Sequence, residues 1–166
     1  MHKILVSRCL LGEKVRYDGN DQLIDHPLMK QWQEEGRIVG ICPEVAGGAP
    51  VPRSPAEITE GDGHTVLIKK AKVMNVRGDN VTDIYRDGAK IALKLAKEHG
   101  IKIALLKENS PSCGGQTIYD GSFQGFKKQG HGVTAALLIE NDIQVFNEKQ
   151  LEEIAKLLDS ETVEIK

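Results

Sequence analysis

Three cysteines are the residues of this 166-residue chain whose type and placement best suit chemistry. Cys9, Cys42 and Cys113 each follow a short apolar run, which is typical of a buried strand. If these strands are neighbours in a parallel sheet, their carboxyl ends meet at one edge and the three thiols converge there. A free cysteine can also be a small buried hydrophobic residue. Three cysteines at three strand ends favour a shared site.

The ligands limit the metal that such a site would hold. Thiolates select zinc or an iron–sulfur cluster, and the linear spacing matches neither a compact zinc motif nor a C-x-x-C redox motif. An iron–sulfur cluster normally takes four cysteines. A [4Fe–4S] cluster held by only three would leave one iron open to bind a substrate atom as a Lewis acid.

Polar residues close to the cysteines are candidates for catalysis and substrate binding. Glu44 is suited to donate or accept protons, although a surface carboxylate or a helix cap would have the same pattern. Ser110 and Ser112 could orient a substrate or a water, or they could satisfy backbone groups of a turn. Lys107 could bind an anionic group or reach solvent. Asp18 is a candidate substrate-binding residue, although it lies in an aspartate-glycine turn, where turn formation is its commoner role.

Glycine pairs follow two of the cysteines. The amides of Gly47 and Gly48 could cradle an anion and contribute to substrate binding, but the segment matches neither a Walker nor a G-x-G-x-x-G pattern. The five histidines show no metal-ligand spacing, and we expect most of them to be exposed to solvent.

Hydrophobic periodicity and turn residues predict alternating strands and helices. The predicted strands are 3–6, 37–41, 65–68, 71–76, 101–106 and 143–146, and the predicted helices are 23–35, 81–99, 133–140 and 151–158. Residues 42–57 contain four prolines and two glycines, so we expect no regular structure there. This order predicts a single α/β domain over residues 1–166, with a Rossmann-like open, largely parallel sheet and helices on both faces.

Composition excludes several classes of protein. Hydrophobic residues make up 40% and charged residues 28%, with a net charge of −2, so neither disorder nor an extended nucleic-acid surface is indicated. The N-terminal segment lacks the pattern of a signal peptide, and no apolar stretch is long enough to span a membrane. We expect a cytoplasmic protein whose cysteines form no structural disulfides.

Four segments together resemble the bacterial thiouracil desulfidase family. They are CLLGEKVRYDG (Cys9–Gly19), CPEVAGGAPVPRSPAE (Cys42–Glu57), LKENSPSCGGQTIYDGSF (Leu106–Phe123) and GHGVTAALL (Gly130–Leu138), and the similarity runs from about Ile4 to Phe146. The resemblance implies an oxygen-sensitive [4Fe–4S] cluster bound by Cys9, Cys42 and Cys113, with the substrate sulfur on the fourth iron. It also implies that water replaces this sulfur without net redox change, that Glu44 is the acid/base residue, and that Ser110, with Ser112 nearby, is the catalytic serine.

The expected function is therefore removal of sulfur from 2-thiouracil or a related small thiolated base. One alternative is a cluster-free cysteine sulfur transferase or hydrolase, but no clear histidine partner for a cysteine nucleophile is found in the sequence. A second alternative is a module that binds a nucleotide or another anion through the glycine-rich loops.

Overall fold

A parallel sheet of four strands forms the centre of the molecule, and the computed structural model describes residues 2–164. The strands are β1 (Ile4–Ser7), β2 (Ile38–Ile41), β5 (Ile103–Leu105) and β8 (Gln144–Phe146). They are hydrogen-bonded in the order β2-β1-β5-β8, and each neighbouring pair is parallel. The chain therefore leaves β1 toward one side to form β2 and later returns on the other side to form β5. Open α/β sheets bind ligands at such a switch point.

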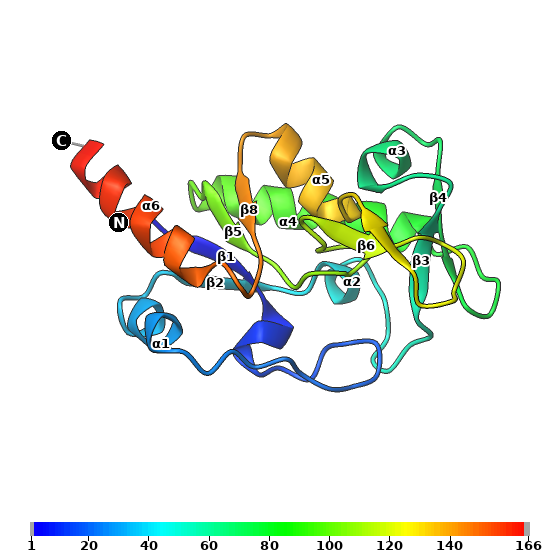
Figure 1. The fold of residues 1–166 in the computed structure, drawn as a ribbon, viewed down its shortest axis with the longest axis horizontal. Helices are drawn as coiled ribbons and strands as arrows, with labels where there is room; N and C mark the ends of the chain where they lie inside the picture. The colour runs from blue at the N-terminus through cyan, green and yellow to red at the C-terminus, as the bar shows by residue number, and fades with distance from the viewer. Residues whose placement is uncertain (1, 165–166) are drawn as a thin grey trace.

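Helices cover both faces of this sheet (Figure 1). They are α1 (Pro27–Glu34), α4 (Thr82–Glu98), α5 (Val133–Glu140) and α6 (Leu151–Glu164). Alternate residues of β1 point to opposite faces, so Ile4 packs in one core cluster with α1 and α6, and Leu5 packs in another with α4 and α5. The predicted fold class, an open parallel α/β sheet with helices on both faces, is confirmed.

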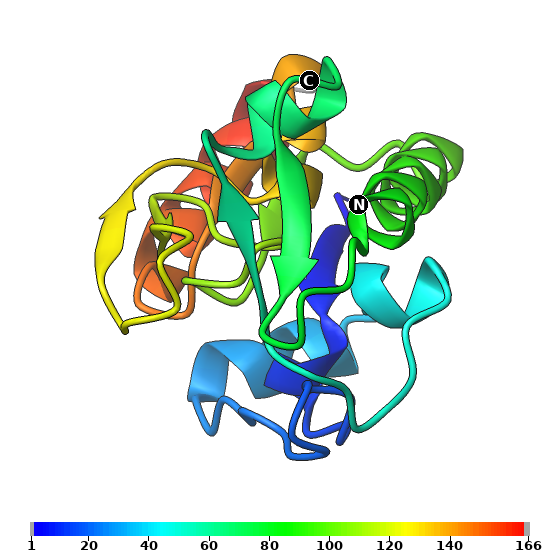
Figure 2. The ribbon, with the colours of Figure 1, turned by 90° about the vertical axis from the view of Figure 1, so that its right-hand side faces the viewer.

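Smaller elements extend the molecule beyond the sheet. They are a 3₁₀ turn η1 (Arg8–Leu11), helices α2 (Pro43–Ala46) and α3 (Gly63–Leu67), and strands β3 (Ala56–Thr59), β4 (Lys72–Asn75), β6 (Thr117–Tyr119) and β7 (Lys127–Gln129). Strands β3 and β4 form one antiparallel pair, and β6 and β7 form another (Figure 2). A third core cluster joins β3, β4 and α3 to α4 and α5.

The predicted strand 65–68 is wrong, because these residues belong mostly to helix α3. Asp62 caps this helix, since its side chain accepts hydrogen bonds from the backbone N–H groups of His64 and Thr65. Thr65 reciprocates by accepting from the Asp62 N–H, which completes a capping box. The pairing partner of β4 is β3 rather than residues 65–68.

Two other boundaries differ from the prediction for local reasons. Segment 42–57 contains regular structure, because Pro43 occupies the first position of α2. The N–H group at this position has no partner within a helix, so a proline there costs no hydrogen bond. Helix α1 begins at Pro27 rather than near residue 23, and the His26 ring caps it by accepting from the Leu28 N–H at 3.0 Å.

Among the helices described in residues 2–164, none is long and apolar enough to cross a membrane.

Candidate functional site

The three cysteines lie at the ends of three adjacent strands. Cys9 is in η1, directly after β1, Cys42 precedes α2, directly after β2, and Cys113 is in the loop that follows β5. All three line one cavity of about 300 Å³ at the carboxyl edge of the sheet. Cys9 and Cys113 are buried and Cys42 is half-buried. The strand order has thus brought together three residues that are distant in sequence.

Burial and mutual proximity hold these thiols in the neutral form. Burial, followed by the charge of Cys42, raises the pKa of Cys9 from 9.0 to about 11. Burial also raises the pKa of Cys42 and that of Cys113, although a hydrogen bond with Ser7 opposes the increase at Cys113. A metal ligand must be a thiolate, so these residues require a bound cation to ionise near neutral pH.

An ion pair forms one wall of the cavity beside Cys42. The Arg53 guanidinium donates to the Glu44 carboxylate, and both side chains are largely buried. Although burial opposes its charged form, the neighbouring Glu44 carboxylate raises the pKa of Arg53. Tyr85 of α4 lies beside this pair, and its burial, followed by the Glu44 charge, holds its pKa well above its usual range. Arg53 thereby fixes the orientation of the Glu44 carboxylate in the cavity wall.

Ser110 and Ser112 have different environments. The Ser110 hydroxyl oxygen accepts from the backbone N–H groups of Ser112 at 3.0 Å and Cys113 at 3.1 Å. With its lone pairs so engaged, its proton is directed to Glu44 Oε1 at 3.5 Å, and Ser110 lines the cavity. Ser112 is fully buried, shares a 2.8 Å hydrogen bond with Thr134, and does not line the cavity.

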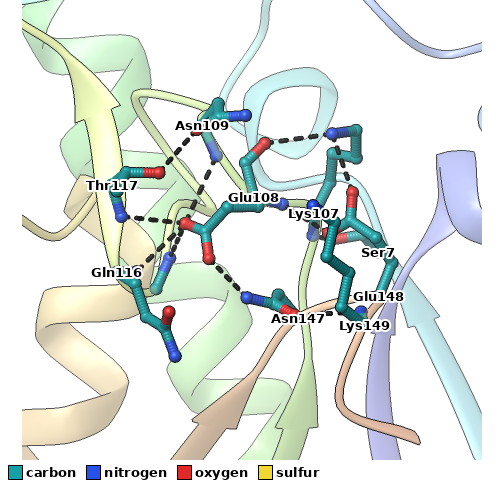
Figure 3. A network of polar contacts seen from close by, with 10 residues as sticks. Ser7, Lys107, Glu108, Asn109, Gln116, Thr117, Asn147, Glu148 and Lys149 are labelled. Atoms are coloured by element: carbon teal, nitrogen blue, oxygen red, sulfur yellow. Dashed lines mark hydrogen bonds and ion pairs between the residues drawn. The ribbon is translucent and has the colours of Figure 1, made fainter. Parts of the chain in front are cut away.

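The Cys113 loop is organised around the Glu108 carboxylate, as Figure 3 shows. Its Oε1 accepts hydrogen bonds from the backbone N–H groups of Asn109 (3.3 Å), Gly115 (2.9 Å), Gln116 (3.0 Å) and Thr117 (3.0 Å), and its Oε2 accepts from the Asn147 side chain (2.7 Å). Burial opposes ionisation, but the N–H groups of Gln116 and Thr117 outweigh it and lower the pKa of Glu108. The charged side chain therefore ties both ends of the loop together.

Lys107 lies between this loop and strand β1 (Figure 3). Its Nζ forms a 2.8 Å ion pair with Glu148 and donates to the Glu108 carbonyl at 3.1 Å. Its backbone N–H donates to the Ser7 hydroxyl at 3.1 Å, which links the segment after β5 to the end of β1 in the cavity lining. Lys107 lines the cavity, so it remains a candidate to contact substrate.

The remaining candidate residues lie outside the cavity lining. Asp18 is exposed, accepts from the Asn20 N–H at 3.0 Å, and lies 3.8 Å from Arg16, which does line the cavity. Gly47 and Gly48 are absent from the lining. A Cβ atom at Gly47 would lie 2.0 Å from a backbone oxygen of α4, so this glycine allows α2 to approach α4. We find no contact through which Asp18, Gly47 or Gly48 would bind a substrate in the cavity.

Sequence reasoning gave no role to Arg53, Tyr85 or Glu108. Arg53 lies between prolines in a proline-rich segment, and this isolated positive charge is the one sequence feature that could have indicated its role. Tyr85 has the spacing of an ordinary helix core residue, and Glu108 is one charge in a polar run. Their roles depend on tertiary contacts, which local sequence patterns do not show.

The fold and site define a doubly wound α/β protein with a three-cysteine site at the switch point of its sheet. The family model for 2-thiouracil desulfurase matches residues 4–150. The chain belongs to this family.

Two relatives cover nearly the whole chain. The uncharacterized protein YbbK of Bacillus subtilis (strain 168) is 44% identical over 151 residues, which are 91% of this chain and 99% of that protein. The solved structure of the [4Fe–4S]-dependent thiouracil desulfidase TudS is 46% identical, with a TM-score of 0.88 over 96% of this chain and 99% of that one.

The donor set of the cavity fits an iron–sulfur cluster. Three sulfur atoms converge from separate strands, and thiolates are the ligands that such clusters require. Arg16 and Lys107 place positive charge near Cys9, which favours its thiolate. Among the described residues 2–164, no histidine lines this cavity, and the only carboxylates in its lining are Glu44, Glu57 and Glu108.

Proposed function

We propose that this protein is an iron–sulfur-dependent desulfidase that removes the sulfur of 2-thiouracil, giving uracil and sulfide. The observation that carries the proposal is the convergence of three cysteines, Glu44 and Ser110 on one cavity in a member of this family. Water supplies the new oxygen and two protons leave with the sulfur, so the reaction needs no external oxidant or reductant. The cysteine ligands are Cys9, Cys42 and Cys113.

A cluster with three cysteine ligands supplies an iron that can act as a Lewis acid toward the thiocarbonyl sulfur. The 166-residue sequence contains three cysteines, and all three line this cavity. The loop around Glu108 holds Cys113 in position, and η1 and α2 do the same for the other two cysteines.

Glu44 is the general acid/base in this proposal. One carboxylate oxygen is held by Arg53, and the other faces the Ser110 hydroxyl at 3.5 Å. Glu44 takes a proton from the attacking water and later returns it to the departing sulfur, as general acid/base catalysis requires. Ser110 orients the water or the pyrimidine oxygen, because two backbone N–H groups fix the direction of its hydroxyl proton.

The substrate is a small molecule. A cavity of about 300 Å³ is at the lower end of the range for small-molecule sites, about 300–1,000 Å³. The net charge of −2 gives no field that would attract extended nucleic acid. Lys107 lines the cavity and is a charged residue that can contact a substituent on the base.

Anaerobic purification followed by a sulfide-release assay with 2-thiouracil tests the proposal. We expect a brown protein with about four irons per chain, and loss of the iron in Cys9→Ala, Cys42→Ala and Cys113→Ala. Glu44→Gln keeps the iron and loses turnover. A colourless protein without iron after anaerobic reconstitution overturns the cluster assignment, and sulfide release from that protein would favour a cluster-free cysteine transferase. Full sulfide release by Glu44→Gln overturns the acid/base assignment.

Parallel assays with thiouracil, thiouridine and thiolated tRNA test the substrate class. We expect turnover of the base or the nucleoside to exceed that of intact tRNA, because a cavity of about 300 Å³ is at the lower end of the range for small-molecule sites. Faster turnover of the tRNA would contradict the small-molecule assignment.

A further inference from the structure

Two histidines that are distant in sequence face each other outside the cysteine cavity. His64 lies on α3 and His131 lies in the loop before α5, and these two helices pack together (Figure 1). The Nε2 atom of His64 is 2.7 Å from Nδ1 of His131, and the rings meet edge to face. Four of the five histidines are half-buried, so the expectation that most would be exposed is wrong.

A carboxylate completes this group from the start of α3. One ligand atom each of Asp62, His64 and His131 lies within 4.8 Å of the other two. Asp62 is fixed in position because it accepts from the backbone N–H groups of His64 at 3.0 Å and His131 at 3.3 Å. All three residues are half-buried, so solvent can reach the group.

A second carboxylate orients the His64 ring. The Nδ1 atom of His64 lies 2.6 Å from a Glu140 carboxylate oxygen. A ring that donates its Nδ1 proton to a carboxylate presents an unprotonated Nε2 on the opposite side. Metal-bound histidines in proteins have this same outer partner, which fixes the tautomer and raises ligand basicity.

We propose that Asp62, His64 and His131 form a binding site for a divalent transition metal ion, and that Zn²⁺ fits it best. Two imidazoles and one carboxylate suit zinc, with water in the fourth position. At Zn–N distances of about 2.0–2.1 Å, two tetrahedral ligand nitrogens lie about 3.3 Å apart, so the histidine nitrogens must separate by about 0.6 Å from their hydrogen-bonded distance of 2.7 Å. A small rotation of one ring provides this. The proton on His131 Nδ1 moves through solvent to Nε2 of the same ring, which leaves Nδ1 free to bind the ion.

Such an ion would brace the loop that carries Cys113. The segment after His131 packs on that loop, because the Gly132 N–H donates to the Gly114 carbonyl at 2.8 Å and the Val133 N–H donates to the Pro111 carbonyl at 2.8 Å. A Cβ atom at Gly132 would lie 2.5 Å from the Ser112 backbone. The metal would therefore join α3 to the segment after His131, which packs against the loop that carries Cys113.

Zn²⁺ titration of the anaerobic holoprotein tests the site, with calorimetry and thermal unfolding as readouts. We expect one saturable equivalent and, at one hundred times the dissociation constant, a Tm increase of roughly 5–10 °C. The cluster absorbance should not change, since the cysteines do not take part. Co²⁺ in place of Zn²⁺ should give a visible spectrum without thiolate charge-transfer bands.

Substitutions decide between this site and any other. His64→Gln and His131→Gln should each abolish the saturable equivalent, and Glu140→Gln should weaken binding by about 10–100-fold. His99→Gln is the matched control, because this exposed histidine at the end of α4 lies outside the group. The proposal is overturned by an absence of saturable binding, by binding that persists in both glutamine variants, or by binding that bleaches the cluster. None of these results depends on desulfidase activity.

Discussion

Glu108 gives the sharpest test of how the Cys113 loop is held. Replacing it by alanine removes the acceptor of four backbone N–H groups and of the Asn147 amide. Hydrogen bonds to a charged group contribute about 1.5–3 kcal/mol each. Their losses do not add, because the carboxylate is only half-buried and water can solvate some of the released N–H groups. We expect Glu108→Ala to cost about 4 kcal/mol and Glu108→Gln about 2 kcal/mol of unfolding free energy.

Anaerobic urea unfolding at pH 7.5 measures these costs, and iron content measures the consequence for the cluster. A loss of about 4 kcal/mol is a large part of the roughly 5–15 kcal/mol that stabilises an ordinary domain. We therefore expect Glu108→Ala to hold less iron than Glu108→Gln, and both to hold less than the parent chain. Glu34→Gln is the control, because Glu34 is exposed on α1, and it should stay within about 0.5 kcal/mol of the parent.

The pH dependence of this difference gives a second check. The fold lowers the pKa of Glu108, so its ionised form stabilises the protein fully above the unfolded-state pKa of about 4.3. This stabilisation is lost as the pH falls through the lower folded-state value. In the cluster-free protein, the parent and Glu108→Gln should therefore converge in stability at acidic pH. Equal stability of the two proteins at pH 7.5, or a gap that persists in acid, would refute the role of the charge.

Three further predictions concern other parts of the site. Ser112→Ala should lower the free energy of unfolding by about 1–3 kcal/mol, because Thr134 loses its hydrogen-bond partner, but it should keep turnover per iron. Ser110→Ala should lower turnover at least about tenfold. The reverse pattern in a sulfide-release assay would exchange the roles of the two serines. Gly47→Ala should lower the free energy of unfolding in urea by about 3 kcal/mol, since the added Cβ atom would overlap the backbone of α4. An unchanged unfolding midpoint would contradict the close approach of α2 to α4. In the cluster-free protein at pH 8, Cys9 should react with iodoacetamide about 100-fold more slowly than an ordinary thiol, because burial raises its pKa to about 11. Mass spectrometry can follow the alkylation of Cys9, and a rate equal to that in the urea-unfolded chain would contradict this prediction.

Local sequence patterns were sufficient for the elements that build the central sheet. The strands at Ile4–Ser7 and Ile38–Ile41 follow from short runs rich in branched apolar residues, and the long helix Thr82–Glu98 follows from its apolar periodicity. The strand predicted at 65–68 failed because the Asp62 cap outweighed the apolar run of Val66, Leu67 and Ile68. The hairpin of β6 and β7 was missed because its short strands carry mostly polar residues, such as Lys127 and Lys128.

The sequence by itself predicted a sulfur-ligand site at a strand edge, because three cysteines each follow an apolar run that is typical of a buried strand. Only the tertiary structure distinguished Ser110, which faces the cavity and Glu44, from Ser112, which is buried against Thr134. It also paired Glu44 with Arg53. The physical reason is that strand order and loop packing set which side chains meet. Ser110 and Glu44 are 66 residues apart and Ser112 and Thr134 are 22 apart, so no local pattern encodes these contacts. Glu44 and Arg53 are only nine residues apart, but they meet because the chain between them turns back.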